Sequence, residues 1–214
     1  YVVQLVESGF WCRQEEAIGI VVESFVASEY ADQLVDFVVI GFDIFVADRP
    51  VIAEAIGVIE YREVAAKLGE MVTYTEMWSH AMDGLEHTAH KTEGGLMALG
   101  SMSGMNIYFS QTSARMVQLL REVSGSGMIM QPSENDLANP ELRPFLDRYM
   151  RGKDVDVEYK SRLYRLAHDL AVSSFGMRQE VYEYWHGGDP NRNRINLLRG
   201  YDQSDMMDRI KGLV

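Results

Sequence analysis

The segment VEYKSRLYRLAHDLAVSSFGMRQEVYEYW, residues 157–185, decides the fold class. Seven of its residues, nearly all of them apolar, recur three or four positions apart, which is the spacing of one helix face. They are Leu163, Leu166, Leu170, Ser174, Met177, Val181 and Trp185. Pro190 follows within a few residues and cannot continue a helix, because proline lacks a backbone N–H. The sequence therefore predicts one long amphipathic helix, Val157–Trp185.

The same apolar spacing predicts three more helices upstream, over Tyr30–Asp48, Glu60–Lys91 and Ile107–Ser124. Loops rich in small residues separate them, at 94–95, 100–104 and 125–127. Long helices joined by short connections are typical of an antiparallel bundle. We therefore expect a mainly α fold, with an antiparallel four-helix bundle over residues 30–190. A short helix around Glu141–Tyr149 should follow a loop that carries helix-capping residues.

The two ends of the chain differ from this pattern. Residues 1–29 include a run of β-branched side chains and predict a short irregular or β segment. Because the chain begins with Tyr1 rather than Met, we expect this segment to be the remnant of a preceding domain. Residues 191–214 form a tail whose apolar side chains have little core of their own to join. We expect the tail to contact a neighbouring subunit.

Composition excludes several classes of function. A net charge of -12 repels phosphate backbones, so nucleic acid is not an expected partner. The longest apolar stretch, from Leu34 to Val46, is interrupted by two aspartates, so no membrane span is expected. Cys12 is the single cysteine, which fits a reducing cytoplasm and rules out a thiolate cluster within the chain.

Three histidines at helical spacing, His80, His87 and His90, raise the question of a metal site. A di-metal bundle site needs a carboxylate three residues before a histidine on each of two helices. The residues at those positions are Met77, Gly84 and His87. We therefore predict no metal site and a polar helix face. His168 and His186 are interpreted as hydrogen-bonded or helix-end histidines.

Four blocks of sequence, in the same order, resemble the 4-hydroxyphenylacetate 3-hydroxylase family. The last is Ser173-Ser174-Phe175-Gly176-Met177-Arg178-Gln179-Glu180, followed by Tyr182-Glu183 and Gly188-Asp189-Pro190. The others are 70–74 (EMVTY), 125–127 with Pro132-Ser133, and 162–169 (RLYRLAHD). The resemblance runs from about Leu34 to the C-terminus.

This resemblance implies a function. Members of the family take reduced FAD from a separate flavin reductase and use O2 to hydroxylate a phenol next to its hydroxyl group. Their fold is similar to that of acyl-CoA dehydrogenases, and this chain resembles only the C-terminal helical domain. We therefore expect the C-terminal part of a homotetrameric, cytoplasmic flavin monooxygenase, whose phenol is free or tethered to a carrier protein. The family's catalytic residues belong to the earlier domains, so none is assigned here.

By resemblance, two segments contribute to the FAD site: Ser174, Phe175, Gly176, Met177, Arg178 and Gln179, and the loop Gly125, Ser126 and Gly127. Glycine inside a helix costs about 1 kcal/mol relative to alanine, so Gly176 indicates close approach by a ligand or another helix. Arg178 is suited to a pyrophosphate or to an adenine ring. The alternatives are helix packing at Gly176, a salt bridge from Arg178 to Glu180 or Glu183, a solvated Gln179, and a plain helix end at 125–127.

Other functions remain open at this point. Acyl-CoA dehydrogenases share the fold, but no catalytic glutamate stands in a recognisable setting. The 4-hydroxybutyryl-CoA dehydratases hold FAD beside an iron–sulfur cluster, which needs several cysteine ligands where this chain has one. A helical oligomerisation module without flavin is the non-enzymatic alternative.

Overall fold

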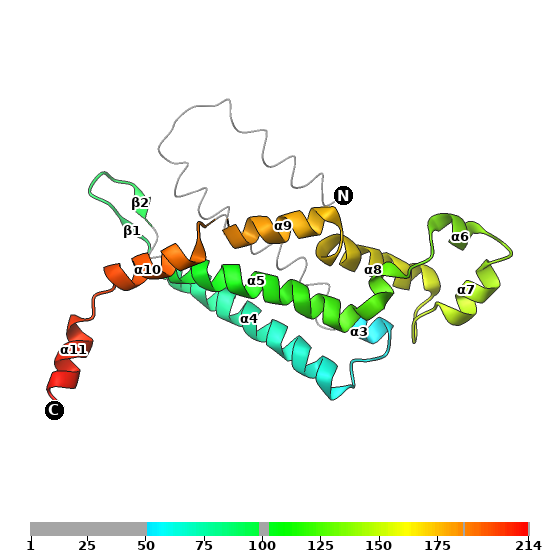
Figure 1. Ribbon diagram of the computed structural model, residues 1–214, viewed down its shortest axis with the longest axis horizontal. Helices are drawn as coiled ribbons and strands as arrows, with labels where there is room; N and C mark the ends of the chain where they lie inside the picture. Colours follow the sequence, from blue (N-terminus) through cyan, green and yellow to red (C-terminus); the bar gives the residue numbers. More distant parts are fainter. Residues whose placement is uncertain (1–50, 99–102, 186, 214) are drawn as a thin grey trace, which may run out of the picture.

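The structure, a computed structural model, describes residues 51–98, 103–185 and 187–213. Within these residues it is mainly helical, which confirms the mainly α part of the expected fold (Figure 1). The helices are α3 (Val51–Ala55), α4 (Arg62–His87), α5 (Ser103–Ser124), the 3-10 helix η1 (Gly125–Ile129), α6 (Glu134–Ala138), α7 (Arg143–Tyr149), α8 (Val157–Ala171), α9 (Ser174–Trp185), α10 (Pro190–Gly200) and α11 (Ser204–Lys211). The segment 1–29 and the helix predicted over Tyr30–Asp48 lie outside the described residues, so the four-helix arrangement stays a prediction.

Helix α5 is the centre of the described bundle. It packs against α4 on one side and against α8 and α9 on the other. Arg121, near the end of α5, meets Glu180 in the second turn of α9, at 2.9 Å. At the other end of α5, a Cβ placed on Gly187 would lie 3.6 Å from the Cβ of Asn106. Helix α9 therefore runs antiparallel to α5, as the sequence predicts for neighbouring helices.

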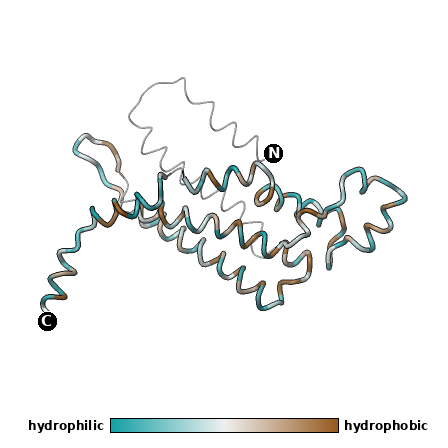
Figure 2. The backbone as a smooth tube through the Cα atoms, viewed as in Figure 1, coloured by the Kyte–Doolittle hydropathy of each residue, from teal (hydrophilic) through white to brown (hydrophobic). Residues whose placement is uncertain are grey.

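The hydrophobic core lies among α3, α4, α5 and α8. Ile52, Leu119 and Ala167 have no exposed surface, and Met71 of α4 is nearly as buried. Figure 2 shows hydrophobic residues recurring along α4, α5 and α8, as the sequence spacing predicts. Tyr164 of α8 is buried as well, and its hydroxyl donates to the backbone oxygen of Ser124 at 3.3 Å. The core thereby fixes α8 beside the end of α5.

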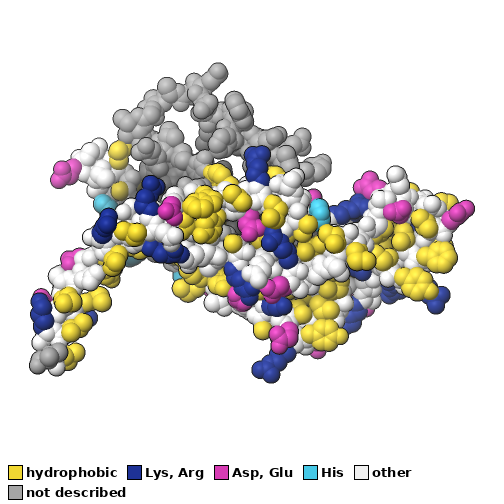
Figure 3. Space-filling model, viewed as in Figure 1, with side chains coloured by type: hydrophobic (Ala, Val, Ile, Leu, Met, Phe, Trp, Pro, Cys, Tyr) yellow, Lys and Arg dark blue, Asp and Glu magenta, His cyan; other side chains and the backbone are white. Residues whose placement is uncertain are grey.

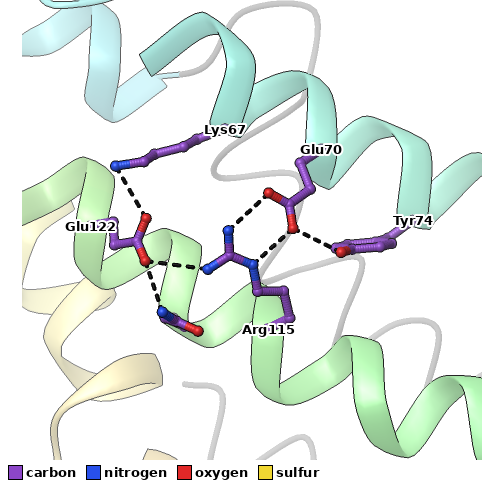
Figure 4. A network of polar contacts seen from close by, with 6 residues as sticks. Lys67, Glu70, Tyr74, Arg115 and Glu122 are labelled. Carbon is purple, nitrogen blue, oxygen red and sulfur yellow. Dashed lines mark hydrogen bonds and ion pairs between the residues drawn. The ribbon is translucent and has the colours of Figure 1, made fainter. Parts of the chain in front are cut away.

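A polar network joins α4 to α5 outside this core (Figure 4). The guanidinium of Arg115 donates to both carboxylate oxygens of Glu70, at 2.7 and 2.9 Å. Tyr74 donates to the same carboxylate at 2.7 Å, and Glu122 accepts from Lys67 and Arg115 at 3.1 and 3.2 Å. The hydrogen bond from Arg115 holds the pKa of Glu70 below its usual value. The network fixes the register of the two helices.

The prediction of one continuous helix over Val157–Trp185 is wrong. Helix α8 ends at Ala171 and α9 begins at Ser174. Val172, at the break, has a φ of -131°, outside the helical range. Valine is β-branched and the two following serines hydrogen-bond readily to nearby backbone, so all three residues favour leaving the helix. The apolar spacing continues across the break, which is why periodicity alone did not reveal it.

The helix predicted over Glu60–Lys91 also differs from the structure. It begins at Arg62 and ends at His87, where Thr88 donates its hydroxyl to the backbone oxygen of Gly84 at 2.9 Å. Two short strands follow, β1 (His90–Lys91) and β2 (Met97–Ala98), and they pair antiparallel with His90 opposite Ala98. The turn between them contains Gly95 with a φ of +82°, a value that favours glycine. Lys91 therefore lies in a strand.

The remaining elements mostly agree with the sequence. Helix α5 begins earlier than the predicted Ile107, so Gly104 is helical rather than part of a loop. Ser133 and Asp136 form a reciprocal capping box at α6, which confirms the expected capping residues. Helix α10 begins at Pro190, one residue before the predicted tail, and packs on α5, so this part of the tail joins the described helices instead of lacking a partner within the chain. Helix α11 projects away from the other described helices with all its residues exposed (Figure 1). Among the described helices, none is long and apolar enough to span a membrane.

Candidate functional site

The predicted site segment Ser174–Gln179 occupies the first half of α9, directly after the break. Ser173 joins the two helices on each side of the break. Its hydroxyl donates to the backbone oxygen of Asp169 in α8 at 2.7 Å, and it accepts from the backbone N–H of Gly176 in α9 at 3.2 Å. One side chain therefore closes the end of α8 and satisfies an unpaired amide at the start of α9.

Gly176 lies against the last turn of α8. A Cβ at this position would stand 2.3 Å from the backbone oxygen of Leu170 and 2.5 Å from that of Asp169. Real Cβ atoms do not approach backbone oxygens so closely, and neither oxygen is at the end of a flexible side chain. Of the two interpretations that the sequence left open for this glycine, close approach by another helix describes the contact seen in the structure.

Arg121 of α5 was not identified from the sequence, although it contacts the site segment. Its Nε donates to the backbone oxygen of Ala171 at 2.7 Å, and its Nη2 lies 2.9 Å from a carboxylate oxygen of Glu180 and 3.0 Å from Sδ of Met177. Arginine in the last turn of a helix is the available sequence signal. That signal does not reveal a backbone acceptor 50 residues away.

Arg178 is exposed on the outer side of α9. The expected alternative, a salt bridge to Glu180 or Glu183, is wrong for the described structure, because Glu180 pairs with Arg121 and Glu183 accepts from Gln179. Within residues 51–98, 103–185 and 187–213, Arg178 forms no ion pair. Its neighbours Phe175 and Met177 are 37% and 44% exposed. This turn therefore presents one cation and apolar surface to the outside.

Gln179 and Glu183 lie on the inner side of the same helix. Glu183 is 4% exposed, and Gln179 donates its amide to the carboxylate. Burial disfavours the charged form of a carboxyl group and raises the pKa of Glu183 to about 7. Gln179 is half-buried and engaged with this partner, so the expected alternative of a solvated side chain does not describe it.

Helix α9 therefore has an unusual distribution of side chains. Its inner face carries Gly176, Gln179 and Glu183, whereas large apolar residues lie on its outer side. These are Phe175, Met177, Val181, Tyr182 and Trp185, all more than a third exposed. Figure 3 shows hydrophobic side chains gathered over α9. A helix that turns apolar side chains outward has a surface suited to a flat ligand or to another part of a protein.

The second predicted segment, Gly125–Gly127, opens the 3-10 helix η1 after α5. Gly125 has a φ of +60°, and a Cβ there would meet open space. Gly127 faces inward, where a Cβ would lie 2.5 Å from the ring of Tyr164. Packing against the core therefore accounts for a glycine at position 127, while Gly125 and Ser126 are exposed. The structure therefore agrees with the alternative interpretation of residues 125–127, in which a helix ends and a tight turn follows.

The histidines form no metal-binding group in the described part of the chain. Nδ1 of His80 lies 2.6 Å from the backbone oxygen of Glu76, and His87 and His90 are exposed. His168 lies at the end of α8, with Nδ1 3.6 Å from a carboxylate oxygen of Asp169. His186 lies outside the described residues.

Comparison with known proteins identifies relatives along most of the chain. The family model described as 4-hydroxyphenylacetate 3-hydroxylase C terminal matches residues 49–214. The oxygenase component of 4-hydroxyphenylacetate 3-monooxygenase from Thermus thermophilus is 31% identical over 172 residues, which are 79% of this chain and 36% of the relative. The chain thus spans about a third of the length of this relative.

Two solved structures are similar in fold. The oxygenase component of 4-hydroxyphenylacetate 3-monooxygenase complexed with FAD superposes with a TM-score of 0.73 and 28% identity, over 86% of this chain and 36% of that one. A 4-hydroxybutyryl-CoA dehydratase from N. maritimus gives a TM-score of 0.66 at 22% identity, over 86% and 36% of the two chains. The second likeness concerns the fold alone.

Proposed function

The chain belongs to the 4-hydroxyphenylacetate 3-hydroxylase C-terminal family, and we propose that it is the C-terminal part of a two-component flavin monooxygenase. The complete enzyme would use reduced FAD and O2 to hydroxylate a phenol next to its hydroxyl group. The observation that carries this proposal is the family match over residues 49–214. The fold similarity to an oxygenase component complexed with FAD supports it.

The exposed residues of α9 fit a flavin dinucleotide. The first half of α9 offers an arginine that has no ion pair among the described residues, with two exposed apolar side chains beside it. A guanidinium pairs well with a pyrophosphate, and an apolar surface suits a flat ring. We propose that Ser174, Phe175, Gly176, Met177, Arg178 and Gln179 hold FAD, with Gly125, Ser126 and Gly127 as a second contact.

The residues of Ser174–Gln179 would divide their tasks by exposure. Arg178 and Phe175 face outward and would touch the cofactor directly. Gly176 and Gln179 face inward and would act by holding the turn in place. Bound flavin supplies the oxygen chemistry, and this part of the protein orients the flavin and excludes water from one side of it.

The proposed partners follow from the family and from the composition. A separate reductase would supply reduced FAD, and a phenol, free or tethered to a carrier protein, would be the substrate. The exposed apolar side chains of α10 and α11 support a homo-oligomer, for which we propose a tetramer. The single cysteine supports a cytoplasmic location. The four-helix, acyl-CoA dehydrogenase-like arrangement would be completed by residues 30–48.

Arg178→Ala tests the flavin site. Removing a charged hydrogen-bond donor should weaken FAD binding by about 1.5–3 kcal/mol and leave the fold intact. Equilibrium titration of oxidised and reduced FAD into the chain, followed by flavin fluorescence or absorbance, measures the affinity. Arg148→Ala is a matched control, because Arg148 is an exposed arginine in α7, outside both proposed segments. Unchanged FAD affinity together with a lower melting temperature would support a purely structural role for Arg178.

Three other functions make different predictions. A dehydratase of the 4-hydroxybutyryl-CoA type needs cysteine ligands for its cluster, and the chain has Cys12 alone. An acyl-CoA dehydrogenase would bind an acyl-CoA thioester, which a competition titration detects. A helical oligomerisation module would bind no flavin at all, so the wild-type FAD titration separates it from both enzymes.

A further inference from the structure

Arg121 contacts both sides of the break between α8 and α9. On the α8 side, its Nε donates to the backbone oxygen of Ala171. On the α9 side, its Nη2 pairs with Glu180 and touches the sulfur of Met177. The residues between Ala171 and Glu180 include the whole segment Ser174–Gln179. One side chain of α5 therefore holds the segment at both ends.

The chemistry of these contacts favours arginine. Ala171 ends α8, where backbone oxygens have no helical partner and a cation is favourable. Glu180 has a carboxylate whose oxygen lies 2.9 Å from the same guanidinium. A guanidinium is planar and carries donors in fixed directions, so it can serve a carbonyl and a carboxylate simultaneously. A lysine ammonium lacks this planar arrangement of donors, so it would bind well to either the backbone carbonyl or the carboxylate but not to both.

We propose that Arg121 is a positioning residue for the flavin-binding segment Ser174–Gln179. It contacts the α8 end and the second turn of α9 together, and thereby sets where the outward-facing Arg178 and Phe175 stand relative to α5. This inference rests on the proposed function, because it assigns the held segment to the flavin. Arg121 itself lies behind that segment and acts through it.

A second arginine of α5 provides a matched control. Arg115 is as exposed as Arg121, with 33% against 34% of its side chain accessible. It also forms an ion pair with a glutamate of another helix, but that partner is Glu70 of α4 (Figure 4). Losing either guanidinium removes an interhelical ion pair, yet only the loss at 121 releases the site segment.

The experiment compares Arg121→Met and Arg115→Met in the 214-residue chain. Hydrogen exchange measures protection of the backbone amides of residues 174–180, and titration measures the affinity for FAD. We expect Arg121→Met to speed exchange in this segment, because its contacts to Ala171 and Glu180 are both lost, and to weaken FAD binding by about tenfold. Arg115→Met should lower the melting temperature without either change.

Two further variants remove only part of the Arg121 contacts. Arg121→Lys keeps the charge and should give intermediate exchange and affinity. Glu180→Gln removes the ion pair but keeps the contact at Ala171, and should also be intermediate. A residue that merely added general stability would change the melting temperature without a selective change in exchange at residues 174–180.

The outcomes test two claims separately: that Arg121 positions the segment Ser174–Gln179, and that this segment binds FAD. If exchange at 174–180 in Arg121→Met equals that in Arg115→Met, the positioning role is overturned, whatever the flavin result. If exchange rises but FAD affinity is unchanged, Arg121 holds α9 for a reason unrelated to flavin, and the inference again fails. If wild-type chain binds no FAD, the proposed flavin contact fails, while the exchange measurement still decides whether Arg121 holds the segment.

Discussion

Gly176 shows how one residue fixes the distance between two helices. Its α-carbon faces the backbone oxygens of Leu170 and Asp169, which leave no room for a Cβ. Gly176→Ala should therefore push α9 away from α8 and lower the free energy of unfolding by about 1–3 kcal/mol, the usual cost of overpacking. Urea unfolding measures this change.

Gly104→Ala is the control for that substitution, since a Cβ at Gly104 meets open space within α5. Alanine favours helix over glycine, so the control should be neutral or stabilising. Equal stability of the two variants would show that α9 moves at little cost.

Glu183 makes stability depend on pH. Its pKa is raised from 4.5 to about 7 because burial disfavours the carboxylate, so the folded chain binds this proton more tightly than the unfolded chain. The free energy of unfolding should therefore fall as pH rises from about 4.5 to about 7 and stay low above that. Glu183→Gln removes this loss, and its stability relative to wild type should improve by up to about 3 kcal/mol between pH 4 and pH 8.

Unfolding in urea at several pH values gives this difference directly. Glu86→Gln, on an exposed turn of α4, is the matched control for the loss of a carboxyl group. A pH-independent stability difference between Glu183→Gln and wild type would contradict the raised pKa of Glu183.

At the scale of elements, periodicity predicted where helices lie but not where they break. The apolar spacing located α4, α5 and the combined length of α8 and α9, because burial of one face requires that spacing. The break at Val172 and Ser173 depends on local backbone preferences that weigh little in a long window. The end of α4 at His87 depends similarly on the hydroxyl of Thr88.

The candidate site was predictable only in part, for a related reason. Resemblance located Ser174–Gln179, and the exposure of Arg178 agrees with a role in binding. Arg121 could not be assigned, because its partners are a backbone oxygen 50 residues along the chain and a carboxylate 59 residues along, in helices whose packing the sequence does not state. The inward turn of Gln179 and Glu183 likewise depends on how α9 sits on α5.

Helix α11 carries a prediction of its own. Met206, Met207, Ile210 and Leu213 are all about half exposed or more, and an isolated helix of eight residues is only marginally stable in water. Packing on a neighbouring subunit would stabilise it. The double substitution Met207→Ser with Ile210→Ser should therefore lower the oligomeric mass seen by light scattering.

The control for α11 alters its polar residues. Asp208→Asn with Lys211→Gln removes a surface ion pair of 3.2 Å, which contributes little. This control should leave the mass unchanged. A wild-type protein that is monomeric at micromolar concentration would contradict the role proposed for α11.

At the scale of the whole molecule, the described helices present one exposed apolar face beside a closed core. The core is closed among α3, α4, α5 and α8, whereas α9 turns its large apolar side chains outward. The chain spans 36% of the length of its Thermus thermophilus relative. We therefore expect the other walls of the proposed flavin site to come from regions that correspond to the remaining length of this relative.

This arrangement predicts that the 214 residues alone do not hydroxylate a phenol, even with reduced FAD and oxygen supplied. Productive oxygen transfer needs a dry, closed pocket and a phenol held within reach by positioned polar groups. The two proposed site segments offer one outward arginine, apolar side chains and a small-residue turn, and we expect these to orient a flavin from one side only. Flavin that is open to water on its other side returns its electrons to oxygen as hydrogen peroxide.

The test supplies the chain with a flavin reductase, NADH and 4-hydroxyphenylacetate or a chlorophenol, and follows catechol and hydrogen peroxide together. Reductase without the chain is the control for peroxide formed by free flavin. Peroxide without catechol is the expected result, because FAD reduction proceeds while the phenol has no closed site. Sustained catechol formation coupled to NADH use would show that the catalytic groups lie within these 214 positions, and the division of labour proposed here would be wrong.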